Sequence, residues 1–235
     1  FSNIPYERVS CPQHRLLARE AAENAMVLLE NRTGILPLNP QKLKTLAVIG
    51  PNADSRQALI GNYYGTAAEY VTALQGIRSY LEGYNVMVRF AAGSHLYLEK
   101  TEGLAASGDR LSEAVLEAER ADVVVLCLGL DETLEGEEND ASNLGGSGDK
   151  EDLLLPKPQR ELLDRVLKTG TPTVVVLFSG SALAVEDPRI AALVWAGYPG
   201  EQGGAALARI LFGEANPSGK LPITFYRRAE DQPDF

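Results

Sequence analysis

The sequence predicts an α/β domain: a six-stranded, mostly parallel sheet sandwiched between helices. Short apolar runs and longer amphipathic stretches alternate along the chain in the order strand, helix, strand. Most of the short runs are apolar throughout, which is typical of parallel strands buried on both faces. Apolar residues make up 45% of the 235 residues and charged residues 23%, so the composition supports a buried core.

The first predicted element is a helix over residues 13–31, where leucine and alanine recur at helical spacing after Cys11 and Pro12. Six apolar runs then predict strands at 45–49, 86–90, 123–128, 173–178, 190–195 and 221–225. Amphipathic stretches long enough to connect parallel strands predict helices at 72–81, 109–120, 158–168 and 203–212. No repeat or linker divides the chain, so we expect a single domain over 1–235.

Composition excludes several classes of function. The formal net charge is -10, which argues against a nucleic-acid or anionic-membrane surface. Cys11 and Cys127 are the only cysteines, so the sequence offers neither a disulfide framework nor a zinc quartet, and we expect no cofactor. No apolar stretch approaches the ~18 residues of a membrane-spanning helix. The chain starts at Phe1 rather than Met, and we expect a piece of a longer polypeptide.

Two tyrosines follow the first predicted strand. In an open parallel sheet, ligands bind among the loops that leave the carboxyl ends of the strands. One such loop contains Gly61-Asn62-Tyr63-Tyr64-Gly65. Paired tyrosines between glycines can form a stacking surface for a sugar or a base, although packing within a turn is the more usual interpretation of such a pair.

The most acidic segment, 131–140, follows the third predicted strand and has six carboxylates in ten residues. Such a run is usually a solvated face. Three features weaken that interpretation and leave room for a general acid, as in glycosidases: the position after a buried strand, the glycines that follow, and the ability of like charges to raise a carboxyl pKa. A calcium or magnesium site is a third alternative, although the spacing does not match the D-x-[DN]-x-[DN]-G loop.

Other motifs are weaker. The glycine-rich loop 197–204 leads into a helix and has the composition of an anion site, but it lacks the G-x-G start of a dinucleotide fingerprint. A tight turn with close helix packing is the alternative. His14 lies at the start of the first predicted helix and His95 lies in Gly93-Ser94-His95-Leu96-Tyr97, and neither is part of a set of cysteines and histidines that would complete a metal site. Ser179 lacks the Gly-x-Ser-x-Gly context of a nucleophile.

Five segments of the chain, in the same order, resemble one known domain. They are 18–31 (AREAAENAMVLLEN), 34–38 (GILPL), 47–53 (AVIGPNA), 196–204 (AGYPGEQGG) and 213–225 (GEANPSGKLPITF). The domain that they resemble is the second domain of glycoside hydrolase family 3, and together they span nearly the whole chain. The tyrosine loop and the Glu-Gly-Glu-Glu sequence look more like β-xylosidases than β-glucosidases.

The resemblance implies an (α/β)6 sandwich with flavodoxin-like layers and a retaining mechanism. In that family an aspartate nucleophile comes from a preceding (β/α)8 barrel, and the second domain supplies the general acid/base glutamate from the loop after its third strand. Alignment on Glu-x-Glu places Glu137 at the acid/base position, with Glu138 as the close alternative. Glu135 would be a supporting or substrate-contacting carboxylate, and Tyr63 and Tyr64 would bind substrate.

One departure from the family bears on the acid/base. In β-glucosidase-like members this residue directly precedes Gly-Asp-Arg, and here Ser147 precedes Gly148-Asp149-Lys150. The serine has no carboxyl group to donate a proton, which favours Glu137.

The resemblance also implies partners. We expect residues 1–12 to be a linker from the barrel of the same polypeptide and 226–235 to begin a linker to a fibronectin-like domain. The substrate would be an oligosaccharide with a terminal β-linked sugar, xylose first and glucose next. We expect the 235-residue chain alone to be inactive, because the nucleophile would be missing. The second hypothesis is a noncatalytic carbohydrate-binding or scaffold module of a multidomain glycosidase.

Overall fold

The computed structural model describes residues 3–98, 108–137, 150 and 152–233. The described strands form one sheet in the order β1-β6-β5-β4-β2-β3, in which β1 runs antiparallel to β6 and the other pairs are parallel. The strands are β1 Val27–Glu30, β2 Thr45–Ile49, β3 Met87–Ala91, β4 Val123–Gly129, β5 Thr173–Phe178 and β6 Ala192–Trp195. The α-helices are α1 Pro12–Ala25, α2 Ala73–Tyr80, α3 Asp109–Glu119, α4 Lys157–Leu167 and α5 Gly203–Leu211.

The central strands are buried on both faces. Every residue of β4 and β5 is buried. Along β4, Val125 and Cys127 point into one core, and Leu126 and Leu128 point into the other. Successive side chains of a strand point to opposite faces, so a strand between two cores is apolar on both of its faces. This explains the continuous apolar runs in the sequence.

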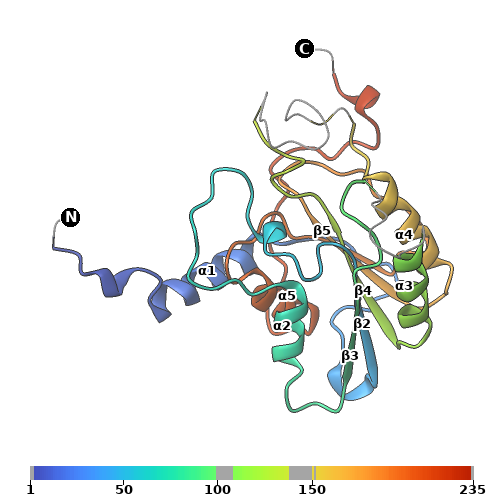
Figure 1. The fold of residues 1–235 in the computed structure, drawn as a ribbon, viewed down its shortest axis with the longest axis horizontal. Coiled ribbons are helices and arrows are strands. Elements are labelled where there is room, and N and C mark those ends of the chain that lie inside the picture. The colour runs from blue at the N-terminus through green and yellow to red at the C-terminus, as the bar shows by residue number, and fades with distance from the viewer. Residues whose placement is uncertain (1–2, 99–107, 138–149, 151, 234–235) are drawn as a thin grey trace.

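Helices cover each face of the sheet. Ile77 of α2 and Leu207 of α5 lie in one core, together with the end of α1. Ala118 of α3 and Leu162 of α4 lie in the other core. Figure 1 shows α2 and α5 on one side of the sheet and α3 and α4 on the other. The prediction of a six-stranded, mostly parallel sheet between helices is confirmed.

The sixth strand is not the one that the sequence predicted. The predicted helix over 13–31 ends at Ala25, and β1 follows it. Met26 and Val27 are adjacent in sequence but lie in opposite cores, as an extended backbone allows and a helix does not. The helical spacing of leucines continued through Leu28 and Leu29 and concealed this change.

The strand predicted at 221–225 is wrong. The segment has no strand backbone, and Pro222 lacks the N–H that a sheet ladder requires. Its apolar residues cover the sheet instead: Leu221 and Phe225 pack against the core on the α3 and α4 side. The ring of Phe225 meets Trp195 of β6 edge-on, with 5.7 Å between centroids.

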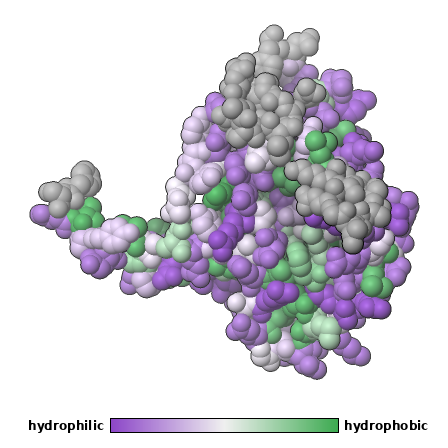
Figure 2. All heavy atoms as spheres, viewed as in Figure 1, coloured by the Kyte–Doolittle hydropathy of each residue, from purple (hydrophilic) through white to green (hydrophobic). Residues whose placement is uncertain are grey.

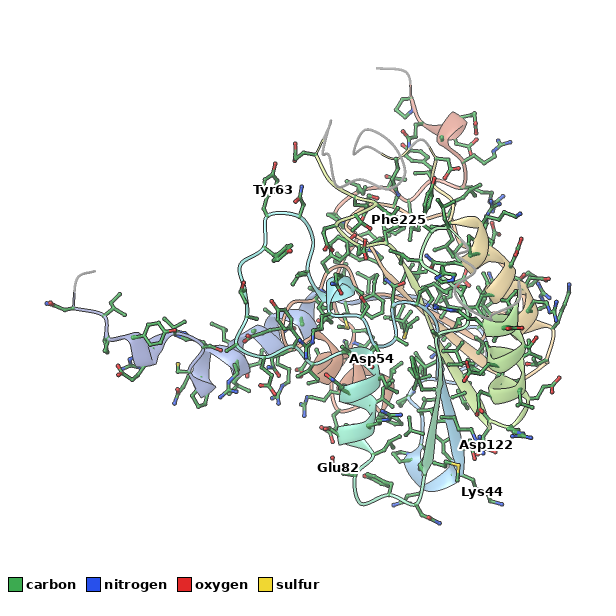
Figure 3. The ribbon with its side chains drawn as sticks, in the orientation of Figure 1. Lys44, Asp54, Tyr63, Glu82, Asp122 and Phe225 are labelled. Carbon is green, nitrogen blue, oxygen red and sulfur yellow. The ribbon has the colours of Figure 1, made fainter. Side chains whose placement is uncertain are left out.

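At the amino end of β2, a carboxylate binds the backbone. Asp122 Oδ2 accepts hydrogen bonds from the N–H groups of Lys44 at 2.7 Å and Thr45 at 2.8 Å. These two bonds lower the pKa of Asp122. Figure 3 shows Asp122 and Lys44 at the opposite end of the molecule from Tyr63.

The N-terminal part of the chain leaves the body as an arm that includes the start of α1 (Figure 1). Figure 2 shows apolar residues on its surface. Its exposed large apolar side chains are Ile4, Tyr6, Val9, Leu16 and Leu17. In the described part of the chain, no helix combines the length and apolar character needed to cross a membrane.

Helices α2 and α5 approach each other where neither has room for a side chain. A Cβ atom on Gly76 would lie 2.0 Å from the carbonyl oxygen of Gly204, and one on Gly204 would lie 1.9 Å from that of Thr72. Both obstacles are backbone, which cannot move aside like the end of a flexible side chain. The close-packing interpretation of the glycine-rich loop therefore agrees with the structure at Gly204.

This contact predicts the effect of one methyl group. Gly204→Ala is expected to lower the free energy of unfolding by about 1–3 kcal/mol, because the helices must separate. Gly65→Ala is the control, since a Cβ there meets no atom within 4 Å. Urea unfolding of the 235-residue chain measures both variants. Equal stabilities for the two would contradict the close helix contact.

Candidate functional site

The carboxyl ends of the parallel strands gather at one edge of the sheet. From β2 the chain moves outward to β3, and then returns past β2 to β4, β5 and β6. The order thus reverses between β2 and β4, which is where open α/β sheets bind ligands. Asn52, which follows β2, is 1% exposed and donates from Nδ2 to the carbonyl of Leu130 at 3.0 Å. This bond joins the loops after β2 and β4.

The acidic loop after β4 begins with a tight turn. Asp131 Oδ1 accepts hydrogen bonds from the backbone N–H of Thr133, at 3.0 Å, and from its hydroxyl, at 2.6 Å. The Asp131 carbonyl accepts from the N–H groups of Leu134 and Glu135. Leu134 is buried beneath the turn. Asp and Thr supply these local acceptors and donors, so the start of the acidic loop is ordered structure rather than a solvated run.

Glu135 is bound by donors from two other loops. Its Oε2 accepts from the N–H of Gly180 at 2.8 Å and from the hydroxyl of Tyr198. Its Oε1 accepts from the N–H of Ser181 at 3.0 Å and from the Ser181 hydroxyl. Gly180 and Ser181 follow β5, and Tyr198 follows β6. The carboxylate therefore connects the carboxyl ends of three strands.

The charge of Glu135 affects the pKa values of two neighbouring side chains, Tyr198 and Lys150. Burial, followed by the negative charge of Glu135, raises the pKa of Tyr198 well above its usual range. Lys150 Nζ donates to the carbonyl of Ala182 at 2.6 Å. Burial lowers the pKa of Lys150, and the charges of Glu135 and Asp152 oppose that shift.

Glu132 has a raised carboxyl pKa within the acidic loop. Burial is the main cause, and the charge of Asp131 contributes less. Its Oε2 is buried and has no hydrogen-bond partner among the described residues. The sequence led us to expect like-charge repulsion as the main cause of a raised pKa in this loop, whereas at Glu132 desolvation is the larger one.

Glu137, the predicted acid/base, is exposed two residues beyond the fixed carboxylate of Glu135. Its backbone therefore leaves an anchored point at the carboxyl edge of the sheet, while its side chain faces solvent. Glu138, the alternative acid/base, lies outside the described residues, as do Ser147, Gly148 and Asp149. The roles of Glu137 and Glu138 stay predictions.

Tyr63 and Tyr64 are 80% and 52% exposed. Tyr63 has a φ of 59°, in the left-handed region, and its N–H donates to Asn62 Oδ1 at 3.1 Å. Figure 3 shows Tyr63 at the tip of a projecting loop. Exposed aromatic rings fit a stacking surface better than packing within a turn, and substrate binding by these tyrosines stays a prediction.

Sequence reasoning missed Tyr198, Ser181 and Gln159. Gln159 is fully buried in α4 and holds the end of β4, because its Oε1 accepts from Gly129 N at 2.8 Å and its Nε2 donates to Gly129 O at 2.7 Å. One available signal was the position of Ser181 and Tyr198, which follow neighbouring predicted strands and therefore lie at the same sheet edge.

No group of three or more His, Cys, Asp or Glu residues is placed to hold a metal ion within 3–98, 108–137, 150 and 152–233. The acidic segment continues beyond these ranges. The described part of the site is a set of carboxylates, tyrosines and a lysine, which suits hydrogen bonding to a sugar and proton transfer.

Comparison with known proteins assigns the family. The model described as the glycosyl hydrolase family 3 C-terminal domain matches residues 26–235. The chain belongs to glycoside hydrolase family 3. The resemblance stated from the five sequence segments is thereby confirmed.

Relatives of this family 3 domain include enzymes named for two sugars. Beta-D-xylosidase 1 of Arabidopsis thaliana is 41% identical over 96% of this chain and 27% of its own length. A β-glucosidase of Erythrobacter marinus is 36% identical, with a TM-score of 0.83, over 96% of this chain and 32% of its own. A family 3 exo-β-xylosidase solved with a xylobiose aziridine probe is 30% identical, with a TM-score of 0.70, over 86% of this chain and 24% of its own. The chain thus spans less than a third of these proteins.

Glu132 gives this family 3 domain a testable pH dependence. The folded state raises the Glu132 pKa, so ionised Glu132 destabilises the fold above that pKa, and the effect disappears below the pKa of the unfolded chain. Glu132→Gln is therefore expected to raise the melting temperature at pH 7. The free energy of unfolding is expected to rise by less than about 1 kcal/mol, because solvent screens a partly exposed group. Thermal unfolding at pH 7 and pH 3 measures it, and an equal gain at both would contradict the desolvation.

Proposed function

We propose that this chain is the acid/base domain of a retaining β-glycosidase that releases terminal β-linked sugars from oligosaccharides. Xylosides are the preferred substrate and glucosides the next. The observation that carries the proposal is the location of Glu137 in a family 3 domain: exposed, just beyond an anchored turn, at the carboxyl edge of β4. The xylosidase names of the relatives support the choice of sugar.

Glu137 would act twice in this reaction. Protonated, it gives its proton to the glycosidic oxygen while an aspartate attacks the anomeric carbon and forms a glycosyl-enzyme. Ionised, it then removes a proton from the water that releases the sugar. Retention of configuration needs the two carboxyl groups about 5–5.5 Å apart. Both roles require a carboxyl group that faces the substrate, and the exposure of Glu137 suits this requirement.

The nucleophile would come from outside this chain. We propose a (β/α)8 barrel of the same polypeptide, joined through residues 1–12, and a fibronectin-like domain reached through 226–235. The chain matches 27% of the length of the Arabidopsis relative, which leaves room for both additional domains. The exposed apolar side chains of the N-terminal arm fit a surface that meets another domain. The 235-residue chain alone would then be inactive.

Glu137→Gln in the full-length polypeptide tests the acid/base role. The variant is expected to hydrolyse dinitrophenyl β-xyloside nearly as fast as wild type in the glycosylation step, because that leaving group needs no proton. Hydrolysis of xylobiose is expected to fall ~10²–10⁴-fold, the usual contribution of general acid catalysis. Single-turnover rates on matched β-xylosides and β-glucosides measure both effects and the preferred sugar.

Glu138→Gln is the matched control, with the same chemical change one residue away. Wild-type hydrolysis of both substrates by Glu138→Gln supports Glu137 as the acid/base. If Glu138→Gln loses xylobiose hydrolysis and Glu137→Gln does not, the role belongs to Glu138. Unchanged xylobiose hydrolysis in both variants would overturn the acid/base proposal and favour the noncatalytic module.

A further inference from the structure

The ring of Tyr198 packs against two loops. A Cβ atom on Gly61 would lie 2.7 Å from Tyr198 Cδ2, and one on Gly180 would lie 3.1 Å from Tyr198 Cε2. Gly61 belongs to the loop after β2 that carries Tyr63 and Tyr64. Gly180 follows β5. The ring thus packs directly against the backbone of both loops, an approach that glycine permits.

The hydroxyl of Tyr198 reaches a third loop through Glu135. Each oxygen of Glu135 accepts from one backbone N–H and from one hydroxyl: Gly180 N–H and Tyr198 on Oε2, and both groups of Ser181 on Oε1. Backbone N–H groups only donate, so this arrangement suits the ionised carboxylate. Charge-assisted bonds of this kind are stronger than neutral ones.

These contacts leave Glu135 little capacity for substrate. A general acid needs a transferable proton, and both oxygens of Glu135 face donors. Of the two roles that the sequence allowed for Glu135, the supporting one therefore fits the geometry better. Glu137 follows two residues later, so a shift of the Glu135 carboxylate would move the backbone that carries Glu137.

We propose that Tyr198 is a positioning residue for glycoside cleavage. Through Glu135 it fixes the loop that carries Glu137, and through Gly61 it holds the loop with Tyr63 and Tyr64 in place relative to the Glu137 loop. The inference rests on the proposed acid/base role of Glu137. One side chain after β6 would thus couple the proton donor to the sugar-binding surface. Burial and the charge of Glu135 keep the Tyr198 hydroxyl protonated, since both raise its pKa, so the hydroxyl remains a donor.

Tyr198→Phe in the full-length polypeptide separates the two couplings. Phenylalanine keeps the ring against Gly61 and Gly180 and removes the hydrogen bond to Glu135. The rate on poor leaving groups is expected to fall about tenfold or more, since small displacements of a catalytic group cost up to ~10²-fold. The single-turnover glycosylation rate on dinitrophenyl β-xyloside is expected to stay near wild type, because that leaving group needs no proton. A plot of the logarithm of the glycosylation rate against leaving-group pKa would become steeper.

Tyr80→Phe is the matched control. Its hydroxyl donates to Glu214 Oε1 at 3.0 Å, on α2 and away from the site, so it loses a Tyr–Glu hydrogen bond of the same kind. It is expected to keep the wild-type dependence on leaving group. Ser181→Ala, which removes one other donor to Glu135, is expected to steepen the plot in the same direction as Tyr198→Phe.

Tyr198→Ala removes the ring as well and is expected to raise KM, because the loop with Tyr63 and Tyr64 loses its contact. A uniform loss of rate over all leaving groups with a lower melting temperature, in Tyr198→Phe and Ser181→Ala alike, would show a merely structural role and overturn the inference. Glu137→Gln in the same assays separates the two proposals. If it steepens the plot and Tyr198→Phe does not, the positioning role fails alone; if Glu137→Gln has no effect, the acid/base role fails.

Discussion

The carboxylate of Glu135 is the contact on which the candidate site depends. Four donors from the ends of β5 and β6 bind it, and the loop after β4 supplies it. Glu137 lies just beyond this point and Tyr63 lies on the loop that packs on Tyr198. Without the hydrogen bonds to Glu135, the six acidic groups of residues 131–140 would repel one another and favour an extended, solvated run. Bound carboxylates at Asp131 and Glu135 give the run a defined start.

The buried sheet makes this arrangement possible. Strands β4 and β5 are buried at every position, and Gln159 binds both backbone groups of Gly129 where β4 ends. Hydrogen bonds between the strands and packing from helices on both faces hold the strand ends at fixed separations. Donors that follow β5 and β6 can then meet an acceptor beyond β4 with little further loss of conformational freedom. Rigid elements thereby present exposed groups at their ends.

The sequence predicted the fold well and the site only in part. Continuous apolar runs identified the parallel strands because burial on both faces removes polar residues from them. The same reasoning failed at 221–225, where apolar residues cover the sheet without joining it, and at β1, where helical spacing of leucines extends into a strand. Glu135 was recognised as a supporting or substrate-contacting residue, but its donors lie 45 to 63 residues away, and local patterns carry no information on such contacts.

A structure of the full-length polypeptide with an uncleaved xylobiose analogue would show directly whether Glu135 stays fixed while Glu137 meets the substrate. We expect a Glu137 carboxyl oxygen within about 2.6–3.2 Å of the glycosidic oxygen. We also expect Glu135 to accept hydrogen bonds from Gly180, Ser181 and Tyr198, as it does here. If Glu135 instead left these donors and bound the glycosidic oxygen, with Glu137 turned to solvent, the roles proposed for the two glutamates would be wrong.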